Sequence, residues 1–311
     1  MTLAFVFPGQ GSQSQGMLKD LAEASPRVGE TFALASEKLG YDLWQIVQDG
    51  PAEDLNRTDI TQPAMLAAGV ATWRVWQAQG GAMPALMAGH SLGEYSALVC
   101  AGSLNFSDAI ALVAERGRLM QAAVPAGEGA MAAILGLDDD AVLQACEEAA
   151  EGEVLAPVNF NSPGQVVAAG NKSAVERLIN VAKERGAKRA LLLPVSVPSH
   201  CSLMQPAADK LASVLEQIEV KAPQVPVINN VDVATPDDPA AIRDALVRQL
   251  YNPVRWVETV QKMAADGVDR LIECGPGKVL VGLNKRIDKN MVAEAVFDSA
   301  SIEAALQTGG E

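Results

Sequence analysis

The stretch LMAGHSLGEYSALVCAG, residues 86–102, decides the fold because it places a serine between two glycines at a change of pattern. The apolar run ALMA before it predicts a strand, and the segment LGEYSALVCAG after it predicts a helix. Ser91 thus lies in a G-x-S-x-G motif between a strand and a helix, which is the context that this motif requires.

Sharp turns of this kind hold a serine in a strained backbone conformation, and flanking glycines avoid collisions with the neighbouring backbone. The hydroxyl is then presented above the sheet. Unpaired N–H groups at the start of the following helix point to the same place, so the Leu92 amide can stabilise an oxyanion. We therefore favour Ser91 as a nucleophile over an ordinary Gly/Ser turn residue.

A serine hydroxyl needs a base before it can attack, and the chain has only two histidines. His90 is adjacent to Ser91, and neighbouring side chains on a tight turn diverge, so we expect it to shape the pocket. His200, in VPSHCSLM, follows a proline-bearing loop, and we favour it as general base and acid over a structural histidine. So few histidines disfavour a zinc site, and no metal is expected.

Three further segments carry candidate polar groups. Gln10, in PGQGSQ, follows a predicted strand, where a second oxyanion donor is often found, but the residues alone leave this role open. Arg116 and Arg118 lie on different faces of one predicted helix, which we expect to be capped near Ser107, so only one of them can face a site. The GPGK at residues 275–278 lacks phosphate-loop spacing and predicts a strand-to-helix turn.

The composition restricts the possible partners. The chain has 311 residues and a formal net charge of −14, which repels nucleic acid and anionic membranes. Apolar runs near the start, such as LAFVF, are too short to span a bilayer, so we predict a cytoplasmic protein. None of the four cysteines forms a CxxC pair, and we expect reduced, mostly buried thiols.

Strands alternate with helices along the chain, which predicts an α/β fold with a mostly parallel sheet. From about residue 126 the pattern becomes β-α-β-β-α-β over roughly 70 residues, as in a ferredoxin-like module. We therefore predict a large hydrolase-like catalytic domain formed by residues 1–125 and 197–311. An inserted ferredoxin-like α+β subdomain would occupy residues 126–196.

Six segments, taken together, carry a resemblance to a known family. FPGQGSQ, TQPA, GHSLGEYSAL, VPSHCSLM, YNPVRW and ECGPGKVLVGL follow one another in this order across almost the whole chain. The set resembles the malonyl-CoA:acyl carrier protein transacylases of bacterial fatty-acid synthesis. The segment VPSH departs from the aromatic pattern of malonyl-specific relatives in polyketide assembly, but it is similar to the stand-alone fatty-acid enzymes.

The resemblance implies a role for each site residue. Ser91 would become malonylated, with His200 as its base and Gln10 and the Leu92 amide as the oxyanion hole. Arg116 would hold the free carboxylate of the substrate, beside His90 in the substrate pocket. The backbone carbonyl of Gln249 would orient the histidine in place of an acid.

The resemblance also implies the reaction and its partners. Malonyl-CoA would donate its acyl group through a malonyl-serine ester to the phosphopantetheine thiol of acyl carrier protein. No cofactor would be needed, and we expect a monomer. The rival interpretations are a serine thioesterase or esterase with the same Ser-His site, a non-catalytic scaffold, and a relative with another acyl preference.

The acidic carrier protein of this pathway would need a local basic surface on a chain of charge −14. Two segments offer one: KERGAKR at residues 183–189 and NKR at residues 284–286. Both are equally typical of solvated helix ends, so the sequence leaves this choice open.

Overall fold

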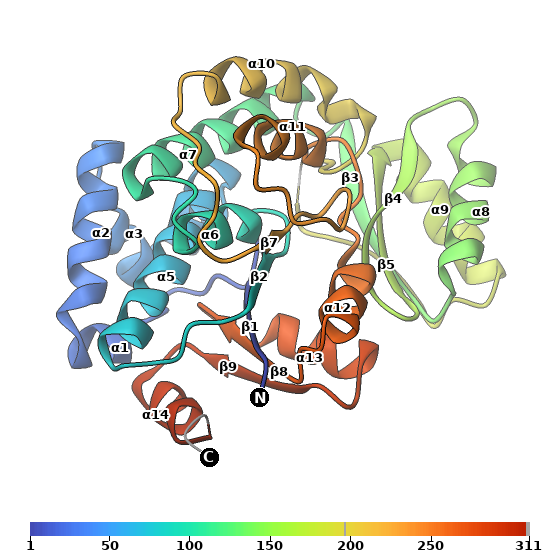
Figure 1. The fold of residues 1–311 in the computed structure, drawn as a ribbon. Coiled ribbons are helices and arrows are strands. Elements are labelled where there is room, and N and C mark those ends of the chain that lie inside the picture. Colours follow the sequence, from blue (N-terminus) through green and yellow to red (C-terminus); the bar gives the residue numbers. More distant parts are fainter. Residues whose placement is uncertain (196, 309–311) are drawn as a thin grey trace.

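The structure is a computed structural model that describes residues 1–195 and 197–308. Within these ranges the chain forms a parallel five-stranded sheet covered by helices and, beside it, an antiparallel four-stranded sheet with two helices of its own (Figure 1). The α/β fold expected from the sequence is confirmed.

The strands are β1 (Leu3–Phe7), β2 (Leu86–Gly89), β3 (Gly129–Leu135), β4 (Leu155–Ser162), β5 (Gln165–Asn171), β6 (Arg189–Leu192), β7 (Val227–Ile228), β8 (Arg270–Cys274) and β9 (Val292–Val296). The helices are α1 (Lys19–Ala24), α2 (Pro26–Leu39), α3 (Leu43–Asp49), α4 (Ala52–Leu55), α5 (Thr58–Ala78), α6 (Gly93–Cys100), α7 (Phe106–Ala123), α8 (Asp139–Ala150), α9 (Lys172–Glu184), α10 (Gln205–Leu215), α11 (Pro239–Gln249), α12 (Trp256–Ala265), α13 (Val279–Ile287) and α14 (Ser299–Thr308), with a 3₁₀ turn at Ser202–Met204.

The parallel sheet has the order β7-β2-β1-β8-β9, so the first strand of the chain lies at its centre. Every residue of β1 is buried, because side chains alternate between two covered faces. Phe5 and Phe7 pack into the core that includes α5, where the Phe5 and Trp73 rings meet edge to face at 5.1 Å. Ala4 and Val6 face the opposite core, which α12 and α13 cover.

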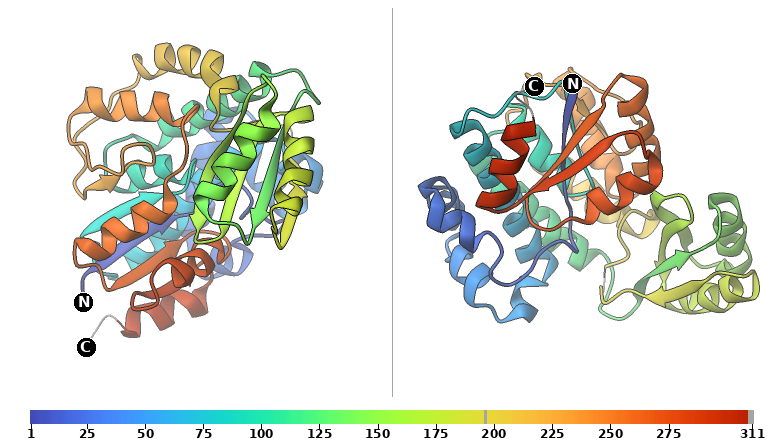
Figure 2. Two further views of the ribbon diagram at one scale, coloured as in Figure 1. Left: turned by 90° about the vertical axis from the view of Figure 1, so that its right-hand side faces the viewer. Right: turned by 90° about the horizontal axis from the view of Figure 1, so that it is seen from below.

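The antiparallel sheet has the order β4-β5-β3-β6. We call this sheet, together with α8 and α9, the lobe. Its elements follow the expected β-α-β-β-α-β order. Val166 and Ala168 of β5 pack under α8 and α9, whereas Val167 and Ala169 pack with Cys201 of the larger part. Figure 2 shows, in the view from below, that the lobe stands to one side.

The lobe therefore uses its second face to meet the larger part rather than solvent. The predicted bounds of this insertion stay a prediction, and residue 196 lies outside the described residues.

Several expectations were incomplete or wrong. Helices α1 to α4 and strand β9 were not anticipated. The cap of α7 is Asn105 rather than Ser107, because the Asn105 side chain accepts hydrogen bonds from the amides of Ser107 and Asp108.

All four cysteines are free thiols in the structure, as expected. Three are buried and Cys100 is half-buried, and burial raises the pKa of the Cys146 thiol to about 12. Among the helices in the described ranges, none combines the length and apolar character that crossing a bilayer requires.

Candidate active site

The turn from β2 into α6 carries Ser91 at φ 51°, in the left-handed region that a serine rarely adopts. The glycines on both sides have a steric cause. A Cβ on Gly89 would lie 1.8 Å from the carbonyl carbon of Gly93, and a Cβ on Gly93 would lie 2.0 Å from the Phe7 oxygen. Only glycine at these two positions allows the turn to pack against β1. The packed turn places Ser91 at the carboxyl end of the parallel sheet.

His200 lies in the loop that returns from the lobe, and it meets the serine directly. Its Nε2 is 2.8 Å from Ser91 Oγ, and its Nδ1 is 2.7 Å from the backbone oxygen of Gln249. Because a carbonyl can only accept, Nδ1 carries the proton and Nε2 is left to accept from the serine hydroxyl. The pair has the geometry of an activated nucleophile whose base is oriented by a third group.

Burial and the nearby Arg116 cation lower the pKa of His200 to about 3. The imidazole is only 3% exposed, so its charged form is strongly disfavoured. His200 is therefore neutral at physiological pH, which is the state that can take a proton from Ser91.

Arg116 extends from α7 to the same point. It is 1% exposed, and its Nη2 lies 3.4 Å from Ser91 Oγ and 3.0 Å from Gln249 Oε1. Its Nη1 donates to Gln62 Oε1 at 2.8 Å. Arg118, two residues on, is exposed and pairs with Glu115, so the expected division between the two arginines is confirmed.

Gln10 and Leu92 line the same pocket as Ser91 and His200. The Leu92 amide lies at the N-terminal end of α6, where N–H groups have no acceptor within the helix. Gln10 follows Gly9, which approaches the turn closely: a Cβ there would lie 2.5 Å from the His90 oxygen. The end of β1 and the start of α6 thus meet beside the serine.

His90 also lines the pocket, but its ring turns toward the lobe. Its Nε2 is 2.8 Å from Asn161 Oδ1 on β4, and its ring lies 5.5 Å from that of Trp256. Burial lowers the pKa of His90. The histidine therefore joins the turn to the lobe, which agrees with the pocket-shaping position expected of it.

The cavity at Ser91 has a volume of about 120 Å³ and takes its walls from both parts of the molecule. The lobe and the segment after it contribute mainly apolar side chains, among them Met131, Leu193, Val195 and Val197. Such a lining excludes water from the space around Ser91 better than a polar one does.

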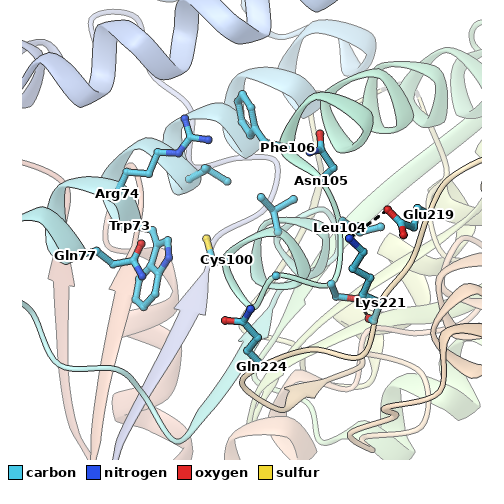
Figure 3. Close-up of a pocket in the computed structure, with 14 residues that line it drawn as sticks. Trp73, Arg74, Gln77, Cys100, Leu104, Asn105, Phe106, Glu219, Lys221 and Gln224 are labelled. Atoms are coloured by element: carbon cyan, nitrogen blue, oxygen red, sulfur yellow. Dashed lines mark hydrogen bonds and ion pairs between the residues drawn. The ribbon is translucent and has the colours of Figure 1, made fainter.

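A wider hollow of about 420 Å³ lies elsewhere, against α5 and α6 (Figure 3). Its charged groups already have partners: Arg74 donates to Thr31 at 2.9 Å, and Lys221 pairs with Glu219 at 3.2 Å. Burial of the sulfur raises the pKa of the Cys100 thiol well above its usual value, which disfavours the nucleophilic thiolate. Size alone therefore does not identify the reactive site.

Two polar residues that the sequence analysis did not single out belong to the site. Asn230, just after β7, accepts from the Ser91 amide at 2.8 Å and donates to the Gly89 oxygen at 2.7 Å. Glu94, in the first turn of α6, is 2% exposed and accepts from Gln249 Nε2 at 2.8 Å. The available signal was weak in both cases: Asn230 belongs to the pair Asn229–Asn230 that ends an apolar run, and Glu94 lies in the first turn of the predicted helix.

Residues 1–195 and 197–308 contain no cluster of three or more His, Cys, Asp or Glu side chains that could hold a metal ion.

The family model for the acyl transferase domain matches residues 4–297. Malonyl CoA-acyl carrier protein transacylase of Salmonella typhimurium is 66% identical over 97% of this chain and 98% of its own length. The Escherichia coli K12 protein of that name is 64% identical, with 98% of each chain covered.

Solved structures agree with these relatives. An acyl carrier protein S-malonyltransferase from Vibrio cholerae has a TM-score of 0.96 at 65% identity, covering 98% of this chain and all of its own. A malonyl-transacylase in complex with a type II PKS acyl-carrier protein has a TM-score of 0.98 at 63% identity, covering 99% and 100%. This chain therefore belongs to the acyl transferase family and, within it, to the malonyl CoA-acyl carrier protein transacylases.

Proposed function

We propose that this chain transfers the malonyl group of malonyl-CoA to the phosphopantetheine thiol of acyl carrier protein through an ester on Ser91, and so supplies the extender unit for fatty-acid synthesis. One observation carries the proposal: the 2.8 Å contact between Ser91 and His200 lies beside a buried arginine. A nucleophile and its base explain acyl transfer, and the buried cation explains a preference for an acyl group that carries a carboxylate.

The first half-reaction follows from this geometry. His200 Nε2 takes the hydroxyl proton as Ser91 Oγ attacks the thioester carbonyl, and the resulting oxyanion is held by the Leu92 amide and a donor of Gln10. The C–S bond then breaks, and coenzyme A leaves with the proton from His200. The Gln249 carbonyl holds the imidazole in the required tautomer throughout.

The second half-reaction reverses these steps with a different thiol. His200 deprotonates the phosphopantetheine thiol, its sulfur attacks the malonyl ester, and Ser91 recovers its proton as the C–O bond breaks. One site therefore serves both thiols in turn, which is a ping-pong cycle. The proposal requires no cofactor for either half-reaction.

Arg116 gives the selectivity for malonyl over acetyl groups. Its guanidinium has five N–H donors, and the bonds to Gln62, Gln249 and Ser91 use three of them. The remaining donors can bind the malonyl carboxylate, and a charge-assisted bond is strong in a site that excludes water. An acetyl group offers no such partner.

We propose that the carrier protein docks on the exposed basic residues of the 183–189 segment, here called the basic patch. Lys188 and Arg189 are exposed, and neither forms an ion pair within the described residues. Arg189 begins β6, and a strand rise of about 3.3 Å per residue puts it roughly 13 Å along the chain from the pocket residue Leu193. Lys285 and Arg286 on α13 offer a second such surface.

The monomeric state and the cytoplasmic location also stay predictions. Light scattering during size-exclusion chromatography would measure the mass directly.

Intact mass spectrometry after brief mixing with malonyl-CoA, without carrier protein, tests the proposed function. We expect a malonyl adduct that is absent in Ser91→Ala and is discharged by added carrier protein or coenzyme A. Acetyl-CoA serves as the comparison donor. Free malonate released without an accumulating adduct would instead establish a serine thioesterase.

A further inference from the structure

Glu94 is a buried acid that the proposed mechanism does not use. It is 2% exposed, and burial raises its pKa to about 7, against the opposing effect of its hydrogen bonds. A carboxyl group kept in such a place is costly unless its oxygens serve several donors. Its Oε2 does so, accepting from the Asn230 amide at 2.9 Å and from Gln249 Nε2 at 2.8 Å.

The Asn230 partner holds the nucleophile turn. Its side chain accepts from the Ser91 amide and donates to the Gly89 oxygen, so it spans the turn from one side to the other. Ser91 has a strained φ of 51°, and such a conformation persists only where the surroundings over-determine it. The backbone amide of the same Asn230 is bound to Glu94.

The Gln249 partner holds the base and the arginine. Its backbone oxygen accepts from His200 Nδ1 at 2.7 Å, and its Oε1 accepts from Arg116 Nη2 at 3.0 Å. Its Nε2 donates both to Glu94 and to the Ser91 oxygen, the latter at 3.1 Å. The two peptide groups that flank Ser91 are therefore held by two residues that share one anchor.

We propose that Glu94 is a positioning residue for the transfer reaction, setting the Ser91 turn through Asn230 and the His200 and Arg116 side chains through Gln249. The Gln249 backbone oxygen takes the place of a triad acid at His200 Nδ1, and Glu94 lies one residue further away, bound to the Gln249 side chain. The inference rests on the proposed function, because it assigns Glu94 a part in the acylation of Ser91.

The test follows acylation of Ser91 in rapid-quench mass spectrometry, which separates the rate of the burst from its amplitude. A purely structural residue lowers the amplitude, because fewer molecules are folded, whereas a positioning residue lowers the rate constant. We expect Glu94→Leu to slow acylation about 10²-fold with malonyl-CoA, the typical effect of a small misplacement. Acylation by acetyl-CoA should also slow, but by less, because acetyl groups do not use Arg116. Glu94→Gln keeps an accepting oxygen and should stay within about tenfold of wild type.

The matched control is Glu115→Gln, which removes an acid on α7 that pairs with the exposed Arg118. It should acylate at the wild-type rate. A wild-type rate constant in Glu94→Leu, with only the amplitude reduced, would overturn the inference. Slowing with malonyl-CoA alone would overturn it too, since Glu94 would then act on Arg116 and not on the nucleophile.

A double-mutant cycle keeps the inference testable if Glu94→Leu does not fold. Glu94→Gln and Asn230→Ala should be less than additive, because part of the effect of Glu94 passes through Asn230. The double variant should be slowed by less than the product of the two single effects. Single effects on the acylation rate that multiply in the double variant would contradict the shared anchor. Absence of a wild-type adduct would refute the proposed function itself, so the two failures are distinguishable.

Discussion

The parallel sheet and the antiparallel lobe face the same cavity but contribute to it differently. Ser91 and the Leu92 amide follow a strand of the parallel sheet, as does Gln10, and the helices α7 and α11 of the larger part supply Arg116 and Gln249. The lobe supplies walls such as Met131 and the polar anchor Asn161.

This difference has a physical origin. Parallel strands end at one common edge, where the N-termini of the following helices gather, so reactive groups converge there. Antiparallel strands end alternately at both edges of a sheet, so reactive groups do not gather at one edge of the lobe. The lobe instead covers the cavity with one face of its sheet. The larger part therefore provides the reactive groups, and the lobe encloses them.

The largest effect is expected on the side of the parallel sheet. Replacing the base in His200→Gln should slow acylation of Ser91 by about 10⁴-fold or more, because no other group accepts the hydroxyl proton. Asn161→Ala, which removes the anchor from the lobe to His90, should cost only about tenfold. Single-turnover kinetics with malonyl-CoA measure both, and comparable losses would break the comparison.

An intermediate effect is expected at Arg116. Arg116→Ala should cost malonyl transfer about 1.5 to 3 kcal/mol, roughly tenfold to over a hundredfold, while sparing acetyl transfer. The ratio of kcat/KM for the two donors is the measurement. Arg118→Ala is the control and should leave the ratio unchanged. Equal losses with both donors would remove Arg116 from carboxylate recognition.

The smallest effect is expected on the outer surface of the lobe. Reversing two charges of the basic patch, in Lys188→Glu with Arg189→Glu, should raise the KM for carrier protein several-fold, since exposed charges each contribute about 0.2 to 1 kcal/mol. Discharge by free coenzyme A should be unaffected. Lys19→Glu with Arg27→Glu, on α1 and α2 away from the lobe, is the matched control. An unchanged carrier KM in the lobe variant would exclude the basic patch.

Much of the fold could be predicted because its signals are local. Short segments of sequence indicate the buried strand β1, the glycine turn around Ser91, and the order of strands and helices in the lobe. Helices α1 to α4 were missed because they are mostly short. The lone His200 could be paired with Ser91 by elimination, and Arg116 by resemblance to the family.

The supporting residues of the site could not be predicted for a different reason. Asn230 and Glu94 bind each other across 136 positions of the chain, and Asn230 binds Ser91 across 139. Nothing near either residue marks its partner. A buried polar residue needs a partner, but only the folded chain shows that these residues are buried and which partner each one has.

The central place of β1 has a consequence for how the enzyme comes into being. Leu3 pairs with Arg270, so the sheet closes only when the two ends of a long chain segment meet, which slows folding. On the ribosome, Ser91 emerges well before His200, Asn230 and Gln249. A half-made chain therefore carries a serine that nothing activates, and the cell's acyl thioesters meet a working nucleophile only once nearly the whole protein has been synthesised.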